Sequence, residues 1–366
     1  MPKMKILFIT RKFPPSIGGM QKVSFQLYRE LNKNHEVYLV AWGKSQKWLP
    51  LFLLFAFFRS AYLIKVNKPD VVYLNDGLLA PFGLLLKLLF KIKIVITVHG
   101  LDITYPNPLY QRVVPFSLAR LDKIVCVSNA TLEECIKRSL SRNICVLIPN
   151  GADPKEYRIN LSKEEIKKRL TKTFNLNFNG KFILLSIGRL VKRKGHVWFI
   201  KQVLPKLPKD IVYLIVGSGS QTNEVKALIE KKSLHESVYL LGQISEEEKK
   251  LLLNGSDLMV MPNIKVRGDF EGFGIVALEA ASCSLPVVAS EIEGIKDTVQ
   301  DGKNGFLIPP YNAATYVERV SQLLQDRKKR ERLARNGYDF IRSNYTWDII
   351  ADKYSKAFLD KGKFSQ

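Results

Sequence analysis

The hydrophobic positions of this chain fall into short continuous runs that alternate with helix-length segments. In the first half the runs are rich in Val, Ile and Leu, and they are Lys5–Thr10, Glu36–Ala41, Asp70–Leu74, Ile92–Val98, Lys123–Val127 and Ile144–Ile148. Such runs are typical of parallel strands that helices cover on both faces. Residues 20–32 and 131–139 have the length of helices. The pattern predicts repeated βα units and a doubly wound parallel sheet.

The alternation stops between residues 153 and 180, where the chain is polar and contains one amphipathic helix over 162–171. It resumes with the runs Phe182–Ile187, Val212–Val216, Ser237–Leu241, Leu258–Met261, Pro286–Ala289 and Phe306–Ile308. A length of 366 residues also favours two domains. We therefore predict two Rossmann-like α/β domains, 1–155 and 181–344, joined by a junction at 156–180 and facing each other across a ligand cleft. A last helix, 345–362, is expected to pack back on the first domain.

Two apolar runs in the first domain bear on membrane contact. Residues 49–58 are apolar, and Arg59 and Lys65 interrupt the pattern that follows. Residues 78–90 form a second run, which contains Lys87. Neither run reaches the roughly 18–20 uncharged residues that a membrane span needs. Two readings stay open: a helix buried against the sheet, or an amphipathic helix at a membrane interface.

The formal net charge of +23 calls for an anionic partner or for a widely solvated basic surface. Nucleic acid, an anionic membrane and a phosphorylated substrate are the candidates. The chain has no zinc-finger spacing and no aromatic RNA-binding signature, so we expect no nucleic acid. Its four cysteines form no C-x-x-C pair, and its N-terminus leads straight into a strand. We therefore expect a cytoplasmic protein with reduced thiols and no signal peptide, peripheral on the cytoplasmic face of the membrane.

The segment Glu271-Gly-Phe-Gly-Ile-Val-Ala-Leu-Glu279 is the most informative motif. Its glycine turn opens an apolar helix, and a helix N-terminus binds anions because its first N–H groups lack partners. The first N–H groups of this helix can therefore face an anion. Glu271 and Glu279 suit hydroxyl groups, because carboxylate oxygens accept charge-assisted hydrogen bonds. A ligand with phosphates and many hydroxyls is a nucleotide sugar. For Glu279, an ion pair with a neighbouring Lys is the alternative interpretation.

Four further loops follow strands and add candidate residues. Gly18 and Gly19 open a helix, although a turn that needs positive φ explains them equally well, and Gly217 fits a plain βα turn better than a nucleotide site. His99 ends a strand beside Gly100 and is as easily structural as functional. After Gly188, Arg189 offers a planar fork and Lys194 a point charge for a diphosphate. Their neighbours Lys192 and Arg193 fit a solvated basic loop.

Together, and in this order, these motifs resemble the family 4 retaining glycosyltransferases, which have the GT-B fold. The likeness covers nearly the whole chain. The loops Phe13-Pro14-Pro15…Gly18-Gly19 and Asp269 to Gly274 look most similar to the phosphatidylinositol mannoside-type mannosyltransferases.

The resemblance implies a role for each candidate residue. Arg189 and Lys194 would hold the donor diphosphate near Gly19, Glu271 and His99 would contact the donor sugar, and Glu279 would hold the ribose. The N–H groups around Phe273, Gly274 and Ile275 would line the sugar and the phosphate. It also implies front-face attack with retention and a hexose of mannose or glucose type.

We expect a GDP-mannose or UDP-sugar donor as substrate, no cofactor, and a lipid-linked or other cell-envelope acceptor. Asp269-x-Glu271 mimics a metal-binding pair, but the basic loop makes a metal redundant, so we expect none. A nucleotide-sugar epimerase on the same fold and a non-catalytic basic binding protein are the alternatives.

Overall fold

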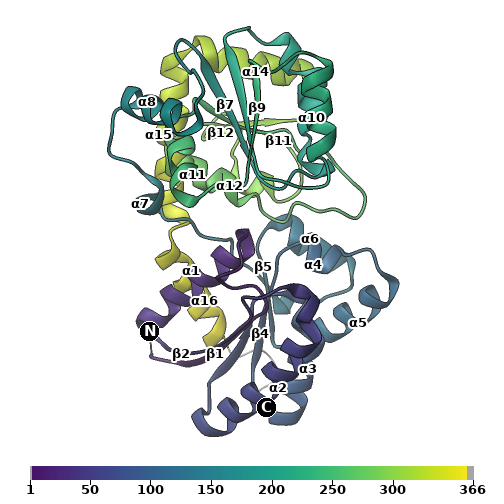
Figure 1. The fold of residues 1–366 in the computed structure, drawn as a ribbon. Coiled ribbons are helices and arrows are strands. Elements are labelled where there is room, and N and C mark those ends of the chain that lie inside the picture. Colours follow the sequence, from purple (N-terminus) through teal and green to yellow (C-terminus); the bar gives the residue numbers. More distant parts are fainter. Residues whose placement is uncertain (1, 361–366) are drawn as a thin grey trace. The chain divides into compact units, whose positions relative to one another are not determined.

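The computed structural model describes residues 2–360 and divides into two compact units. Unit 1 comprises the chain up to Gly151, residues 268–273 and the chain from Trp347 on, and unit 2 comprises residues 152–267 and 274–346. Each unit holds one six-stranded parallel sheet with helices on both faces (Figure 1). The predicted pair of doubly wound α/β sheets is confirmed.

Unit 1 has the strand order β2-β1-β3-β4-β5-β6. Its strands are β1 (Lys5–Thr10), β2 (Glu36–Ala41), β3 (Val71–Leu74), β4 (Ile94–Val98), β5 (Lys123–Cys126) and β6 (Cys145–Leu147). Its helices are α1 (Gly19–Asn34), α2 (Leu49–Asn67), α3 (Ala80–Phe90), α4 (Leu101–Thr104), α5 (Pro108–Leu118), α6 (Asn129–Lys137) and α16 (Trp347–Leu359). Each predicted strand of this half is present, with its ends displaced by at most two residues.

The two faces of the unit 1 sheet bury different side chains. Leu7 and Ile9 of β1 join the apolar core that includes residues of α2, α3 and α5. Phe8, which points the opposite way, packs edge-on against Tyr28 of α1 and Tyr73 of β3. Tyr73 in turn contacts Tyr354 and Phe358 of α16. The last helix therefore completes this face, and residues 361 and 362 of its predicted range lie outside the described residues.

Unit 2 has the strand order β12-β11-β10-β7-β8-β9. Its strands are β7 (Phe182–Ile187), β8 (Ile211–Val216), β9 (Val238–Gly242), β10 (Leu258–Met261), β11 (Val287–Ser290) and β12 (Gly305–Ile308). Its helices are α7 (Pro154–Tyr157), α8 (Lys163–Phe174), α9 (His196–Gln202), α10 (Thr222–Lys231), α11 (Glu246–Gly255), α12 (Ile275–Ser282), α13 (Ile295–Thr298), α14 (Ala313–Gln325) and α15 (Arg327–Asn344).

The segment predicted as a junction belongs to unit 2. Helix α8 starts with a capping box in which Ser162 and Glu165 satisfy each other's backbone N–H groups. Its residues Ile166 and Leu170 are buried in the same core as Leu252 of α11. Residues 156–180 are therefore not a linker, because their apolar positions pack into the unit that follows them.

Helix α2 is longer than the apolar run at 49–58 suggested. Its 19 residues continue through Arg59 and Lys65, and the helix is long and apolar enough, by length and composition, to cross a membrane. However, Phe52, Ala56 and Leu63 are buried in the core of unit 1. One side of α2 is thus a core-packing surface. The cysteines at 126, 135, 145 and 283 are all unpaired thiols.

Candidate active site

In unit 1, polar side chains gather where β1, β3 and β4 end. The Arg11 guanidinium forms an ion pair of 2.7 Å with the buried carboxylate of Asp76. Asn75 donates from Nδ2 to the Ser24 hydroxyl at 2.6 Å, and its Oδ1 lies 3.3 Å from His99 Nε2. The carboxyl ends of parallel strands share one sheet edge, which is where α/β folds bind ligands. Arg11, Asn75 and Asp76 were missed as site candidates, although a polar Asn-Asp-Gly directly after a strand is a usable signal.

His99 is held by its own loop. Its backbone N–H and that of Gly77 each donate to Asp102 at 2.8 Å. Burial lowers the pKa of His99, and the nearby carboxylates of Asp102 and Asp76 oppose that shift only in part. Burial, reinforced by the charge of Asp76, raises the pKa of Asp102. A neutral imidazole that donates through Nε2 to Asn75 therefore fits this position.

Glu271 lies in unit 1, because residues 268–273 pack against the loop after β4. A Cβ atom on Gly272 would lie 1.7 Å from the carbonyl oxygen of His99, and one on Gly100 would lie 2.7 Å from the Phe270 ring. The two backbones can approach this closely only because both positions are glycine. Glu271 itself is buried. Its segment therefore adjoins the segment of His99, as a shared site would require.

The start of α1 carries the glycine pair of the first loop. Gly18 precedes the helix with a φ of 156°, and Gly19 is its first residue. No side chain caps this N-terminus, and the first turn contains no acidic residue. The first N–H groups of α1 are therefore available to an anion, as at other open helix N-termini.

In unit 2, the basic loop after β7 is tightly packed at its glycines. The end of the Lys194 side chain lies over Gly188, where an added Cβ would come within 3.3 Å of Lys194 Cε. Gly217 lies against Gly188 in the same way, with an added Cβ only 2.0 Å from the Gly188 carbonyl oxygen. Arg189 is exposed and Lys194 half-buried. The ends of β7 and β8 thus bring Gly188, Lys194 and Gly217 together.

The expectation that Arg193 is solvated was wrong, whereas Lys192 is exposed as expected. Arg193 retains only 7% of its accessible surface, and its carbonyl accepts from the Ile264 N–H at 2.8 Å. The cause is the one-turn 3-10 helix Lys192–Lys194, which directs its central residue inward.

Helix α12 carries the second half of the glutamate motif. Gly274 precedes it in the left-handed region, with a φ of 75°, and no side chain caps the helix. Ile275 is its first residue, and no acidic residue occupies the first turn. This N-terminus therefore presents N–H groups and partial positive charge. Phe273, the remaining member of the predicted turn, belongs to unit 1.

Glu279 lies inside α12, where it is buried rather than half-buried, with only 3% of its surface exposed. Its Oε1 accepts hydrogen bonds from the Tyr157 hydroxyl at 2.6 Å and from Lys249 Nζ at 2.7 Å. Burial, followed by the charge of Glu279, raises the pKa of Tyr157. Within residues 2–360, no hydrogen-bond partner is present for Glu279 Oε2. The Lys pair considered from the sequence is thus present, yet one buried oxygen is left for a ligand.

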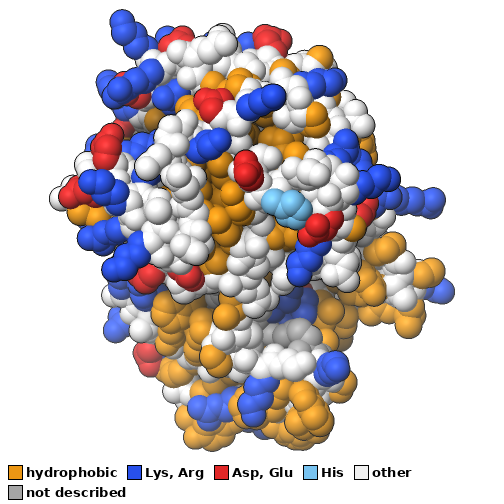
Figure 2. Space-filling model, turned by 45° about the horizontal axis from the view of Figure 1, so that its top comes forward, with side chains coloured by type: hydrophobic (Ala, Val, Ile, Leu, Met, Phe, Trp, Pro, Cys, Tyr) orange, Lys and Arg blue, Asp and Glu red, His pale blue; other side chains and the backbone are white. Residues whose placement is uncertain are grey.

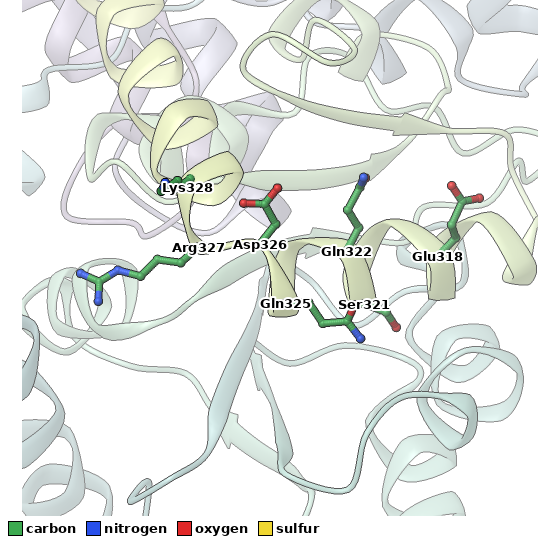
Figure 3. Close-up of a pocket in the computed structure, with 7 residues that line it drawn as sticks. All are labelled: Glu318, Ser321, Gln322, Gln325, Asp326, Arg327 and Lys328. Carbon is green, nitrogen blue, oxygen red and sulfur yellow. The ribbon is translucent and has the colours of Figure 1, made fainter.

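A surface depression elsewhere in unit 2 has no such chemistry. It measures about 730 Å³ and lies where α14 meets α15. Figure 3 shows that Glu318 and Gln322 project from one side of α14, and Ser321 and Gln325 from the other. These side chains do not converge, and none of the predicted site residues is among them. In the described part of the chain, no cluster of three or more His, Cys, Asp or Glu has the arrangement of a metal site.

Comparison with known proteins assigns the family. Residues 17–156 match Glycosyltransferase Family 4, and residues 168–340 match Glycosyl transferases group 1. The chain belongs to the family 4 glycosyltransferases and is therefore a transferase of glycosyl groups.

Two of the relatives match over nearly their whole length. An uncharacterized glycosyltransferase of Methanocaldococcus jannaschii is 28% identical, with 95% of this chain and 96% of that protein aligned. The GDP-mannose-dependent alpha-(1-6)-phosphatidylinositol monomannoside mannosyltransferase of Mycolicibacterium smegmatis is 26% identical over 93% of this chain and 95% of its own.

Solved structures share the fold. Anabaena HepE in complex with UDP superposes with a TM-score of 0.80 at 21% identity, over 96% of this chain and 99% of its own. Sucrose-phosphate synthase from Thermosynechococcus elongatus also reaches a TM-score of 0.80, at 20% identity, over 97% and 98%. These similarities confirm the GT-B class of fold.

Proposed function

We propose that this glycosyltransferase moves a hexose of mannose or glucose type from a nucleotide diphosphate donor to an acceptor hydroxyl, with retention of configuration. The observation that carries the proposal is the arrangement along α12. An uncapped N-terminus is followed, on the same helix, by a buried carboxylate whose Oε2 has no partner within residues 2–360. One rigid element therefore offers N–H groups for phosphate and an acceptor for a ribose hydroxyl.

The reaction chemistry follows from where charge develops. The bond between the anomeric carbon and the diphosphate oxygen breaks, which leaves positive charge on the sugar and negative charge on the diphosphate. Arg189, Lys194 and the N-terminus of α12 are suited to stabilise the anionic leaving group. The acceptor oxygen forms the new bond, and its proton passes to the departing phosphate oxygen. Attack from the face that the leaving group vacates gives retention without the two-carboxylate geometry of glycosidases.

The same argument bears on metal dependence. Two cationic side chains and a helix N-terminus already supply the charge that a divalent cation would otherwise supply. We therefore propose metal-independent transfer without a cofactor. Activity that EDTA abolishes and Mg²⁺ or Mn²⁺ restores would contradict this part.

The donor is proposed at the level of its class. The Mycolicibacterium relative is named for GDP-mannose, and HepE structures contain UDP or UDP-glucose. GDP-mannose is our first candidate, followed by UDP-glucose and UDP-N-acetylhexosamines. For the acceptor we propose a lipid-linked glycan or phospholipid, because the Mycolicibacterium relative is named for a phosphatidylinositol mannoside.

A panel of GDP- and UDP-sugars tests the proposal. We expect one donor to raise the melting temperature and to be hydrolysed slowly without acceptor, and the anomeric configuration of the glycoside to match that of the donor. Interconversion of the free nucleotide sugar would instead identify an epimerase. Absence of donor binding, with tight and salt-sensitive nucleic-acid binding, would identify a basic binding protein.

A further inference from the structure

Helix α2 exposes one apolar side while its other side is buried in the core. Leu51, Leu54, Phe55, Phe58 and Tyr62 recur at helical spacing and retain between 52% and 64% of their surface. Phe52 and Ala56, on the opposite side, are fully buried. A helix that is apolar all round is normally buried on all sides or embedded in lipid. Here the outward side has no protein cover within the described residues.

The exposure continues over the two neighbouring helices. Helix α3 packs against both α2 and α5, so the three helices form one row on the sheet. On α3, Leu88 is 70% exposed and Leu89 56%, and on α5 Leu109 is 71% exposed and Phe116 55%. The apolar face, as we call it, comprises nine side chains: Leu51, Leu54, Phe55, Phe58 and Tyr62 of α2, Leu88 and Leu89 of α3, and Leu109 and Phe116 of α5. Figure 2 shows hydrophobic side chains crowded at the bottom of the view, with Lys and Arg among them.

The apolar face combines nine exposed large hydrophobic side chains on three adjoining helices. Soluble monomers rarely expose contiguous apolar patches larger than a few hundred Å² unless the patch binds something. Leu51, Leu54, Phe55, Phe58, Arg59 and Tyr62 also line a shallow depression of about 450 Å³ on α2 itself. An occupant of this face must therefore offer apolar groups over a broad and nearly flat area.

The charges around the apolar face decide what that occupant is. Residues 42–69 contain five basic residues and no acidic one, namely Lys44, Lys47, Arg59, Lys65 and Lys68. All five are exposed. A second copy of the chain would bring the same cations to this surface, and like charges would oppose the contact. Anionic lipid headgroups are complementary, because a polybasic segment is attracted to the negative surface that they form.

Two arginines show how such a surface can meet a bilayer. The Arg59 guanidinium lies over the Tyr62 ring at 5.5 Å, and that of Arg120 lies over the Phe116 ring at 3.5 Å. In both pairs the aromatic body belongs to the apolar face and the charged end can reach a phosphate. Long cationic side chains adopt this arrangement at membrane interfaces.

We propose that unit 1 binds the surface of an anionic lipid bilayer through the apolar face, with α2 lying in the plane of the interface. Although α2 has the length and composition of a span, it cannot cross the bilayer in this fold, because Phe52, Ala56 and Leu63 are core residues of unit 1. Burial of a helix side at the headgroup boundary, supported by cations, is the interfacial mode. The inference adds a membrane partner to the proposed function. Binding to the bilayer does not itself depend on that function; only the purpose of the binding rests on it.

Flotation of the full chain with vesicles tests the inference without any sugar donor. We expect the protein to float with phosphatidylcholine vesicles that contain phosphatidylglycerol. With pure phosphatidylcholine vesicles, or in 0.5 M NaCl, the floated fraction should be at least about tenfold lower. Phe55→Ser with Phe58→Ser should reduce flotation by at least about tenfold, because two inserted rings are lost. Arg59→Gln with Lys65→Gln should weaken it by a smaller factor.

Matched variants separate this surface from general effects. Ile136→Ser with Leu147→Ser alters two exposed apolar residues of unit 1 outside the apolar face, and Lys226→Gln with Lys231→Gln removes two exposed cations of unit 2. Both controls should float like the unaltered chain, and near-ultraviolet circular dichroism checks that every variant is folded. Equal flotation of the Phe55/Phe58 variant and the unaltered chain, or concentration-dependent dimers without vesicle binding, would overturn the inference. Donor hydrolysis without vesicle binding would overturn it alone, whereas vesicle binding without any donor use would overturn only the proposed function.

Discussion

The two units share one architecture but differ sharply in what they expose. Each has a six-stranded parallel sheet with helices on both faces. Among the described residues, 21 large hydrophobic side chains are exposed, and 20 of them belong to unit 1, with Tyr311 the one in unit 2. Since the same fold can be built with a polar exterior, the fold does not require the exposure in unit 1. It points to a surface that unit 1 contacts and unit 2 does not.

The candidate chemistry divides in a different way. Unit 2 contains Gly188, Arg189, Lys194, Gly217, Gly274, Ile275 and Glu279, and unit 1 contains Gly18, Gly19, His99, Glu271 and Phe273. The groups suited to a diphosphate and a ribose are concentrated in unit 2. Unit 1 combines a polar network at its strand ends with the apolar face. The comparison therefore separates the proposed donor binding in unit 2 from the proposed membrane contact in unit 1, and each can be tested without the other.

The largest effect is expected from the basic loop of unit 2. Lys194→Ala and Arg189→Ala should each lower kcat/KM for the donor by about 10²–10³-fold, because each removes a cation that we propose stabilises the leaving diphosphate. Lys192→Ala is the matched control, since this exposed lysine lies in the same loop. Steady-state kinetics with the donor identified in the panel gives the comparison. An equal loss of kcat/KM in all three variants would contradict a specific role for Lys194 and Arg189. Reduced vesicle flotation of the Lys194 and Arg189 variants would contradict the separation of the two functions between the units.

The two sheets could be predicted well from the sequence, because buried parallel strands consist of continuous apolar runs. All twelve predicted strands are present, Glu279 lies on the predicted helix, and Gly274 directly precedes it. The partners of Glu279 could not be predicted. Tyr157 and Lys249 are 122 and 30 residues away along the chain, and neither follows a strand or joins a motif. Hydrogen bonds of such separation are set by packing rather than by local pattern.

Like the partners of Glu279, the assignment of the Glu271 segment to unit 1 could not be predicted from the sequence. Residues 268–273 lie in the middle of the sequence of unit 2, and nothing local marks their contact with His99 and Gly100.

Helix α2 illustrates a third limit of prediction from the sequence. Its first ten residues, 49–58, are all apolar, so no pattern among them tells which side faces the core. The choice between a buried and an interfacial helix therefore needed the exposure of Phe55 and Phe58.

A smaller effect is expected from the support of Glu279. Lys249→Met removes the cation from a carboxylate that is almost fully buried, so we expect about 3 kcal/mol of destabilisation. Lys250→Met is the matched control on the same helix, because the Glu247 carboxylate of its ion pair is 81% exposed and such a pair contributes less than about 1 kcal/mol. Urea denaturation followed by circular dichroism measures both. If the two variants unfold alike, the Lys249 pair does not stabilise unit 2, and the account of a held Glu279 fails.

The smallest effect is a pH dependence located in unit 2. His196 directly follows the basic loop of unit 2 and is buried, its Nδ1 lies 3.0 Å from the Tyr213 hydroxyl, and its Nε2 has no partner within residues 2–360. Burial, with the charge of Lys194 second, lowers the pKa of His196 to about 3. Below the ordinary histidine pKa of about 6.5, the unfolded chain therefore binds a proton that the folded chain does not, and stability falls as the pH decreases.

His196→Gln isolates this contribution, because the other histidines are the same in both proteins. Each pH unit between about 6.5 and 3 is worth about 1.4 kcal/mol, so between pH 6.5 and pH 5 the unaltered chain should lose about 2 kcal/mol more than the variant. Urea denaturation at both pH values measures the difference. At pH 7.5, where the ring is neutral in both states, the pH-dependent term vanishes and only the cost of the substitution remains. A pH response that is the same in both proteins would mean that the ring becomes protonated in the folded state, and that the packing around His196 is looser than the structure of unit 2 shows.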